Sequence, residues 1–198
     1  MADPAYIVDG VLTDGEAWVG LGTTTLGVDT TTVTFTSTDD GQVGDWSQYM
    51  DLFLIIYGRN DRADTGSDQA MMVLNNVSAT GAYTYQYIRG NGSAASANSS
   101  RGQTTLPVGY FIRNLETANI FCASTIHLFD INSGKYKSGL VQVACEIDDG
   151  SGYDYAGLIA LTANSQAPIT EIDLTVGYGD WLTGSSFSLF GILPRMVA

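Results

Sequence analysis

Polar and apolar residues alternate along many short segments of the chain, which is the period of a half-buried β-strand. Val33 and Phe35 alternate with threonines, while Leu52 to Tyr57 is apolar throughout and predicts a central strand covered on both faces. Clusters of Gly, Asn, Asp and Ser separate nearly all of these segments, as turns do. Further strands are predicted at Trp18–Leu21, Gln69–Leu74, Tyr83–Arg89, Ile120–Phe129, Lys135–Ile147, Tyr153–Leu161, Ile169–Val176 and Phe187–Ile192.

No segment carries an apolar stripe of helical period long enough for a sizeable helix, so we expect at most one or two short helical turns. Roughly ten strands with short connections favour an all-β fold, an antiparallel β-sandwich that is jelly-roll-like. No internal repeat or change in composition divides the strand series. We therefore expect an extended N-terminal arm over residues 1–17 and a single β-sandwich domain over residues 18–198.

The N-terminal arm contains apolar residues that it cannot bury well by itself, because they follow neither a strand nor a helix period. These residues are Tyr6, Ile7, Val8, Val11 and Leu12. We expect them to become ordered against a partner, so they are the candidate anchor.

Two later segments are expected to be exposed connections. Asn91 to Gly102 consists of small and polar residues and cannot supply core contacts, so we predict an exposed loop. The acidic turns at Asp39–Gly41, Asp61–Asp64 and Asp148–Asp154 are interpreted as solvated turns, because they lack the spacing of a calcium loop.

The two cysteines predict the register of one hairpin. If the strands around Ile120–Phe129 and Lys135–Ile147 turn between Ser133 and Gly134, Cys122 and Cys145 lie opposite each other. Ser124 then lies beside Val143, and Ile126 beside Val141. We expect side-by-side reduced thiols, because a protein assembled in the cytosol seldom keeps disulfides.

The net charge of −13 disfavours nucleic acid as a partner, because a polyanion would be repelled. The N-terminal residues do not have the composition of a signal peptide, and the longest apolar run is too short to span a bilayer. We therefore expect a soluble protein made in a cytosol, with neither a nucleic acid nor a membrane as its partner.

The sequence offers little for catalysis, so we expect a non-enzymatic protein. His127 is the only histidine and is predicted to share a strand face with Ala123 and Thr125, without a nucleophile motif to accompany it. No metal-ligand spacing and no complete glycine-rich phosphate loop is present, so we expect no metal and no cofactor.

Three tyrosines alternate along one predicted strand, so the rings of Tyr83, Tyr85 and Tyr87 should lie on one face. Such a row can pack within the sheet, form a subunit interface or stack on sugars. We favour packing or an interface, because no cluster of acids and amides accompanies the rings.

About two thirds of the chain resembles a group of small structural proteins of tailed phages. The most specific segment is the ending, an Ile-Thr-x-Ile strand followed by Gly-Ser-x-Phe-Ser-Leu-aromatic-Gly-Ile. The segments that carry the resemblance are Leu74-Asn75-Asn76, Tyr83-Thr84-Tyr85, Ile88 to Ser93, Thr117 to Phe121, Lys135 to Ser138, Ile169 to Val176 and Phe187 to Ile192.

The resemblance implies a jelly-roll virion protein, assembled in the host cytoplasm. The first hypothesis is a capsid decoration protein on the head exterior, a homotrimer bound to the major capsid protein through the arm. The alternative is a tail-associated fibre or receptor-binding protein that contacts tail proteins or host glycan. A glycan-cleaving enzyme is the third and least favoured hypothesis, because it would need a carboxylate pair in a cleft.

Overall fold

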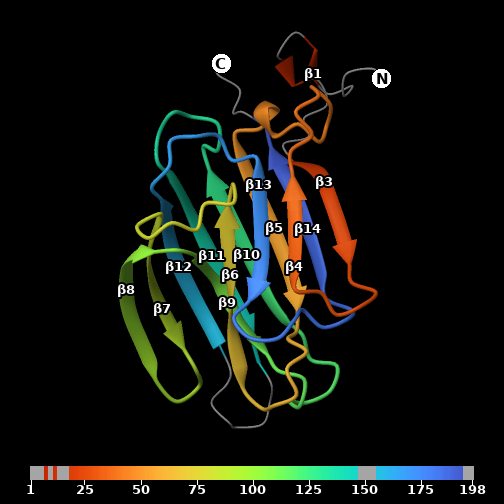
Figure 1. The fold of residues 1–198 in the computed structure, drawn as a ribbon, viewed down its shortest axis with the longest axis vertical. Helices are drawn as coiled ribbons and strands as arrows, with labels where there is room; N and C mark the ends of the chain where they lie inside the picture. The colour runs from red at the N-terminus through yellow and green to blue at the C-terminus, as the bar shows by residue number, and fades with distance from the viewer. Residues whose placement is uncertain (1–6, 9–10, 13–17, 147–154, 194–198) are drawn as a thin grey trace.

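The computed structural model describes residues 7–8, 11–12, 18–146 and 155–193, most of which lie in β-strands. Two antiparallel sheets pack face to face as a jelly-roll-like sandwich (Figure 1). The larger sheet has eight strands in the order β3-β14-β5-β10-β11-β12-β7-β8, and the smaller has four in the order β4-β13-β6-β9. The predicted all-β antiparallel sandwich is confirmed.

The strands of the larger sheet are β3 (Trp18–Thr25), β5 (Asp51–Gly58), β7 (Tyr83–Gly90), β8 (Ala95–Gln103), β10 (Cys122–Phe129), β11 (Lys137–Cys145), β12 (Tyr155–Ala163) and β14 (Ser186–Ile192). The strands of the smaller sheet are β4 (Thr32–Thr36), β6 (Ser67–Leu74), β9 (Leu106–Ile112) and β13 (Glu171–Val176). In the described ranges, helical structure is limited to a 3-10 turn at Trp46–Gln48, as expected. No helix among these residues has the length and apolar character needed to cross a membrane.

The arm contributes one short pairing. Strand β1 (Ile7–Val8) pairs antiparallel with β2 (Val11–Leu12), although the pattern had indicated no strand there. Tyr6 and the rest of the arm lie outside the described residues.

The core fills the space between the two sheets. Strand β6 alternates buried and half-buried positions, and its buried residues Met72 and Leu74 face Ile126 and other apolar residues of the larger sheet within one cluster. Burying apolar side chains of this size stabilises the fold by roughly 1.5–3 kcal/mol each. The alternation of apolar and polar residues therefore predicts a strand correctly wherever one face of that strand meets this core.

The expectation that Leu52–Tyr57 is covered on both faces is wrong. The run forms β5, a central strand as predicted, and buries Leu54 and Ile56 against the smaller sheet. Its other face looks outward, where Ile55 is 39% exposed and Tyr57 is 48% exposed. Apolar side chains on this outer face are thus available for contacts beyond the sandwich.

The segment Asn91–Gly102 is exposed, as expected, but it is not a loop. Residues 91–94 form the turn of a hairpin, and Ala95 to Gln103 form the edge strand β8, which pairs with β7.

Strand β9 was not predicted either. It is buried at almost every position, and it contains Pro107 and Gly109, which are residue types common in turns.

The hairpin of β10 and β11 has the predicted register. Ser124 pairs with Val143 and Ile126 with Val141, so the apolar residues of both strands share the inner face. The Cα atoms of Cys122 and Cys145 lie 4.5 Å apart, and the two residues form a disulfide. The expectation of reduced thiols is therefore wrong, because the register places both sulfurs within bonding reach.

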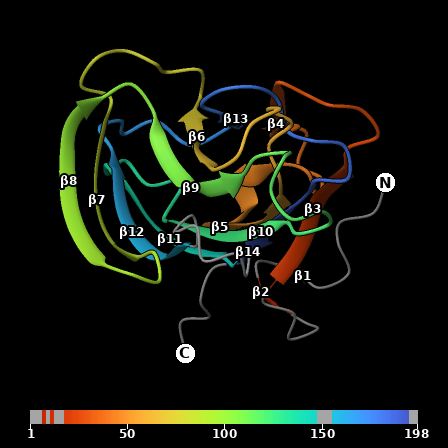
Figure 2. The ribbon, with the colours of Figure 1, turned by 90° about the horizontal axis from the view of Figure 1, so that it is seen from below.

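Strands β7 and β8 extend the larger sheet past the edge of the smaller one. Figure 2 shows the two strands curving away at one side, where β9 is the edge of the smaller sheet. Within the larger sheet, β8 pairs with β7 alone. In this overhanging hairpin nearly every residue of β8 is exposed, which separates β8 from the packed body of the sandwich.

Candidate functional site

A chain of aromatic rings crosses the outer face of the larger sheet, on the side opposite the core. The Trp18 ring, at the start of β3, lies 4.8 Å from the Phe53 ring on β5 and 6.2 Å from the Phe190 ring on β14. On β10, the His127 ring lies 5.8 Å from that of Phe53 and 3.9 Å from that of Phe129. We call these five residues the outer aromatic face.

The outer aromatic face arises from strand alternation. Phe53 lies between the buried residues Leu52 and Leu54, so its own side chain must point away from the core. The Trp18 side chain is 49% exposed, which leaves a large apolar area in contact with water. The arrangement is typical of a surface that contacts another molecule.

His127 belongs to this face through a hydrogen bond to Asp51. The His127 Nε2 atom lies 3.0 Å from Asp51 Oδ2, and the backbone N–H of Asp130 donates to Asp51 Oδ1. Among the described residues these are the groups that hold the buried Asp51 carboxylate, and no hydroxyl nucleophile joins them. The pair therefore orients the imidazole ring against its aromatic neighbours.

The three alternating tyrosines share one face of β7, as their spacing predicts, but they differ in burial. Tyr83 is 1% exposed, and its phenol oxygen accepts a hydrogen bond from the Leu74 backbone N–H. Burial raises the pKa of this phenol. Tyr83 therefore packs in the core, whereas Tyr85 and Tyr87 are half-buried at its margin.

Arg89 ends this row within a group of aromatic rings. Its guanidinium carbon lies 5.0 Å from the Tyr87 ring centroid, 5.2 Å from that of Tyr110 and 4.9 Å from that of Tyr155. The rings of Tyr110 and Tyr155 stack at 4.2 Å, and burial raises the pKa of the Tyr155 phenol. Cation–π contacts of this kind fasten β7 to β9 and β12.

Strand pairing brings two predicted segments onto a single face. Tyr85 pairs with Ser100, Tyr87 with Asn98, and Arg89 with Ser96, whose hydroxyl accepts from Arg89 Nε at 3.2 Å. Residues that pair directly point to the same side of a sheet. The tyrosine row and the polar residues of β8 therefore form one inner hairpin face, turned toward the β9 edge.

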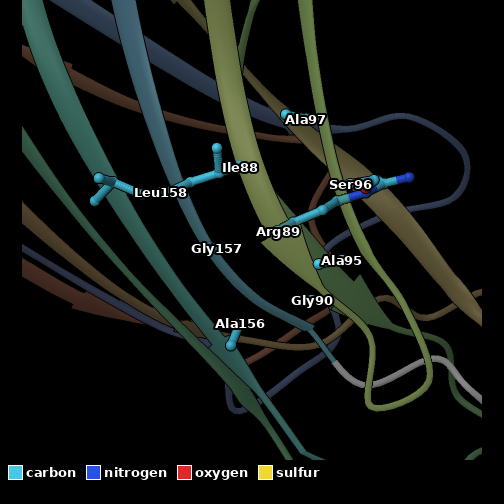
Figure 3. Close-up of a pocket in the computed structure, with 9 residues that line it drawn as sticks. All are labelled: Ile88, Arg89, Gly90, Ala95, Ser96, Ala97, Ala156, Gly157 and Leu158. Carbon is cyan, nitrogen blue, oxygen red and sulfur yellow. The ribbon is translucent and has the colours of Figure 1, made fainter.

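The outer side of the same hairpin carries a shallow apolar groove (Figure 3). The groove has a volume of about 530 Å³ and continues into a second hollow of about 510 Å³. Ile88, which is 60% exposed, and Leu158 line it together with the small side chains of Ala97 and Ala156.

Charge is distributed unevenly around this hairpin. The chain has 21 acidic residues, yet from Gln69 to Leu115 it has none, and its charged side chains there are Arg89, Arg101 and Arg113. Strands β11 and β12 also lack acidic residues. The overhanging hairpin thus carries no acidic residue of its own in a strongly acidic protein, although the segment that joins β11 to β12 is acidic.

The structure places the other candidate residues as follows. Ile7 and Val8 pair with Val11 and Leu12 in β1 and β2, and the side chains of all four, like Tyr6, lie outside what the structure describes. Among the described residues, no group of three or more His, Cys, Asp or Glu side chains lies close enough to hold a metal ion.

The acidic turns that the structure describes are held by hydrogen bonds and an ion pair. Asp40 accepts from Thr38 and from the Gln42 backbone N–H, while Asp64 contacts Arg113 at 3.3 Å. The turn at Asp148–Asp154 lies outside the described residues.

Sequence reasoning missed the outer aromatic face and the group around Arg89. Each assembles from strands that are distant in sequence, so no local spacing encodes it. One signal was available for the first: Phe53, Ile55 and Tyr57 make β5 apolar on both sides, which fits an outward binding face as well as a second covering layer.

No family model matches the chain, and no curated protein matches its sequence. A solved structure of the Ruminococcus gnavus IT-sialidase CBM40 bound to alpha2,6 sialyllactose is similar at a TM-score of 0.33 and 7% identity, over 89% of this chain and 95% of that one. The CBM2 module of the Lactobacillus casei BL23 phage J-1 evolved Dit gives 0.21 and 7%, over 84% and 70%. TM-scores this low establish no shared fold, and the ligands of those proteins say nothing of this chain.

Proposed function

We propose that the chain is a non-enzymatic structural protein of a tailed-phage particle, a decoration subunit bound to the major capsid protein on the head exterior. The observation that carries this proposal is the outer aromatic face. An exposed tryptophan joined to partly exposed aromatic rings in one patch favours a protein interface over a solvated surface.

The position of the patch supports the same proposal. Trp18 follows directly after the arm, so the apolar arm residues and the outer aromatic face are adjacent in the chain. A single partner surface can cover both. The arm then acts as the anchor, and the sheet face supplies the larger contact.

Binding to bare heads tests this proposal. Full-length protein is mixed with heads that lack it, and the bound fraction is measured by sedimentation. Trp18→Ser should weaken binding at least tenfold, because a buried interface tryptophan often contributes 2 kcal/mol or more, about a thirtyfold change.

Tyr178→Ser is the matched control, because Tyr178 is 69% exposed and is not part of the patch. It should bind as the unaltered protein does. If Trp18→Ser bound heads as tightly as the unaltered protein, the interface would lie elsewhere on the molecule. If the unaltered protein bound tails but never heads, a tail-associated role would replace the decoration role.

Deleting residues 2–15 tests the arm separately. The truncated protein should keep its fold, because the strands from Trp18 onward form the core, but it should no longer bind heads. Unchanged affinity would show that Ile7, Val8, Val11 and Leu12 are not the anchor.

The inner hairpin face supports a second candidate function, a tail-associated protein that contacts host glycan. Tyr87 and Asn98 pair across β7 and β8, which combines an aromatic ring with an amide as saccharide sites do. A glycan array with the purified protein tests this candidate. A saturable hit that Asn98→Ala removes would favour it, and the lack of any hit would exclude it.

A further inference from the structure

Strand β8 is an open sheet edge, and from its charge and composition we infer that it pairs with β8 of a second copy of this chain. It terminates the larger sheet, and its backbone has an unpaired side of hydrogen-bonding groups along Ala95–Gln103. Such an edge can accept another strand.

The other open edges have features that hinder pairing, whereas β8 has few. Strand β9 contains Pro107 and a register shift, β4 has five residues, and the pairing of β3 is interrupted by a shift between Leu189 and Phe190. In β8, the pairing with β7 runs without interruption from Ala95 to Ser100.

The side chains of this stretch leave room for a neighbouring strand. Ala95 and Ala97 lie on the outer face, and Ser96, Asn98 and Ser100 lie on the inner face. None is bulky or charged. Natural edge strands are commonly protected by lysine or proline, and Ala95 to Ser100 contains neither.

The charge distribution favours a second copy as the occupant. Two molecules of net charge −13 repel each other over most of their surfaces, but the β7–β8 hairpin lies within the acid-free stretch from Gln69 to Leu115. Two copies can therefore bring their β8 edges together without setting acidic side chains of the hairpins against each other.

A two-fold antiparallel pairing centred on Ala97 sets each Ala97 opposite the same residue of the second copy, and it keeps outer-face residues opposite outer-face residues. It joins Ala95–Ser99 of both copies by roughly four to six backbone hydrogen bonds. Arg101 of one copy then lies opposite position 93 of the other, so the two Arg101 residues are about eight strand positions, or roughly 26 Å, apart. That distance exceeds the Debye length of about 8 Å at physiological salt, so their repulsion is screened.

This pairing yields a dimer with a continuous sheet, in contrast to the trimer that the family resemblance implies. Strand pairing alone buries less than the roughly 1,600 Å² of a typical stable interface. We therefore expect a dimer that dissociates on dilution.

Analytical ultracentrifugation over a concentration series, with the full-length protein, tests the inference. The unaltered protein should move from monomer to dimer as its concentration rises. Ala97→Lys should remain monomeric, because it places two like charges at the centre of the pairing. Ala160→Lys, an equivalent change on an exposed outer position of β12, should still dimerise.

Hydrogen exchange provides an independent readout. Amides of Ala95–Ser100 should exchange more slowly at high concentration in the unaltered protein, but not in Ala97→Lys. A monomer at every concentration, a trimer, or a dimer that persists in Ala97→Lys would each overturn the inference. Head binding by Ala97→Lys should be retained, so this test is separate from that of the proposed function.

Discussion

The guanidinium carbon of Arg89 lies 4.9 Å from the ring centroid of Tyr155, which links the overhanging strand β7 to its neighbour β12 by more than backbone hydrogen bonds. Two further rings surround the same cation. We predict that Arg89→Ala lowers the free energy of unfolding by about 1–2 kcal/mol, because partly desolvated cation–π contacts are lost.

Urea unfolding measures this change. The control is Arg101→Ala, which removes an exposed arginine of β8 and should change the free energy of unfolding by less than about 0.5 kcal/mol. Equal effects of the two substitutions would show that the rings around Arg89 add nothing to stability.

Tyr83 and Tyr85 should respond differently to removal of the phenol oxygen. Tyr83→Phe leaves the Leu74 backbone N–H without its partner in the core, which should cost about 1–3 kcal/mol. Tyr85→Phe, at the half-buried margin, should cost less than about 0.5 kcal/mol. A similar loss in both, measured by chemical denaturation, would contradict the burial difference between them.

The disulfide between Cys122 and Cys145 predicts a simple mass measurement. Protein denatured without reductant and treated with iodoacetamide should gain no adduct, and it should gain two after reduction. Two adducts in the unreduced sample would show free thiols. Replacing both cysteines by alanine should lower stability by about 3 kcal/mol, because the bond closes a loop over a sequence separation of 23.

Stability should depend on pH through Asp45. Its carboxylate accepts hydrogen bonds from the backbone N–H groups of Ser47 and Gly41. A hydrogen bond with the Ser47 side chain is the main reason that the pKa of Asp45 lies below the usual value, and the two backbone bonds lower it further. A carboxyl with a lowered pKa stabilises the fold above its unfolded pKa, and this contribution is lost as pH falls through its folded pKa.

Asp45→Ala should therefore cost about 1 kcal/mol at pH 7, as loss of a helix cap does. The difference from the unaltered protein should shrink as the pH falls below 3.8, the ordinary pKa of an aspartate. Thermal unfolding at several pH values measures it. A constant difference down to pH 2 would rule out the carboxylate as the cause.

The sequence predicted most core strands because burial on one face imposes a period of two. The hairpin of β10 and β11 is the clearest case, since only one register keeps Ile126 and Val141 together on the inner face. The disulfide was not predicted, because the rarity of disulfides in cytosolic proteins was given more weight than the hairpin register, which sets Cys122 opposite Cys145.

Two strands of the sandwich escaped prediction for opposite reasons. Strand β8 is exposed on nearly every residue, so it has no apolar period, and β9 is buried on nearly every residue, so it does not alternate. The contacts of the candidate surfaces, such as Trp18 with Phe53 or Arg89 with Tyr155, join residues far apart in sequence. Their pairing depends on sheet order, which local patterns do not specify.

The overhang of β7 and β8 also separates the residues that form the core from residues whose identity can vary. Because β8 contributes almost nothing to the core, its residues and the turn at 91–94 can change, or receive inserted sequence, with little effect on folding. In the proposed decoration role, a particle coated with this subunit would then display a foreign peptide placed at Gly92 in many identical copies, a permissive position for engineering and for evolutionary diversification alike.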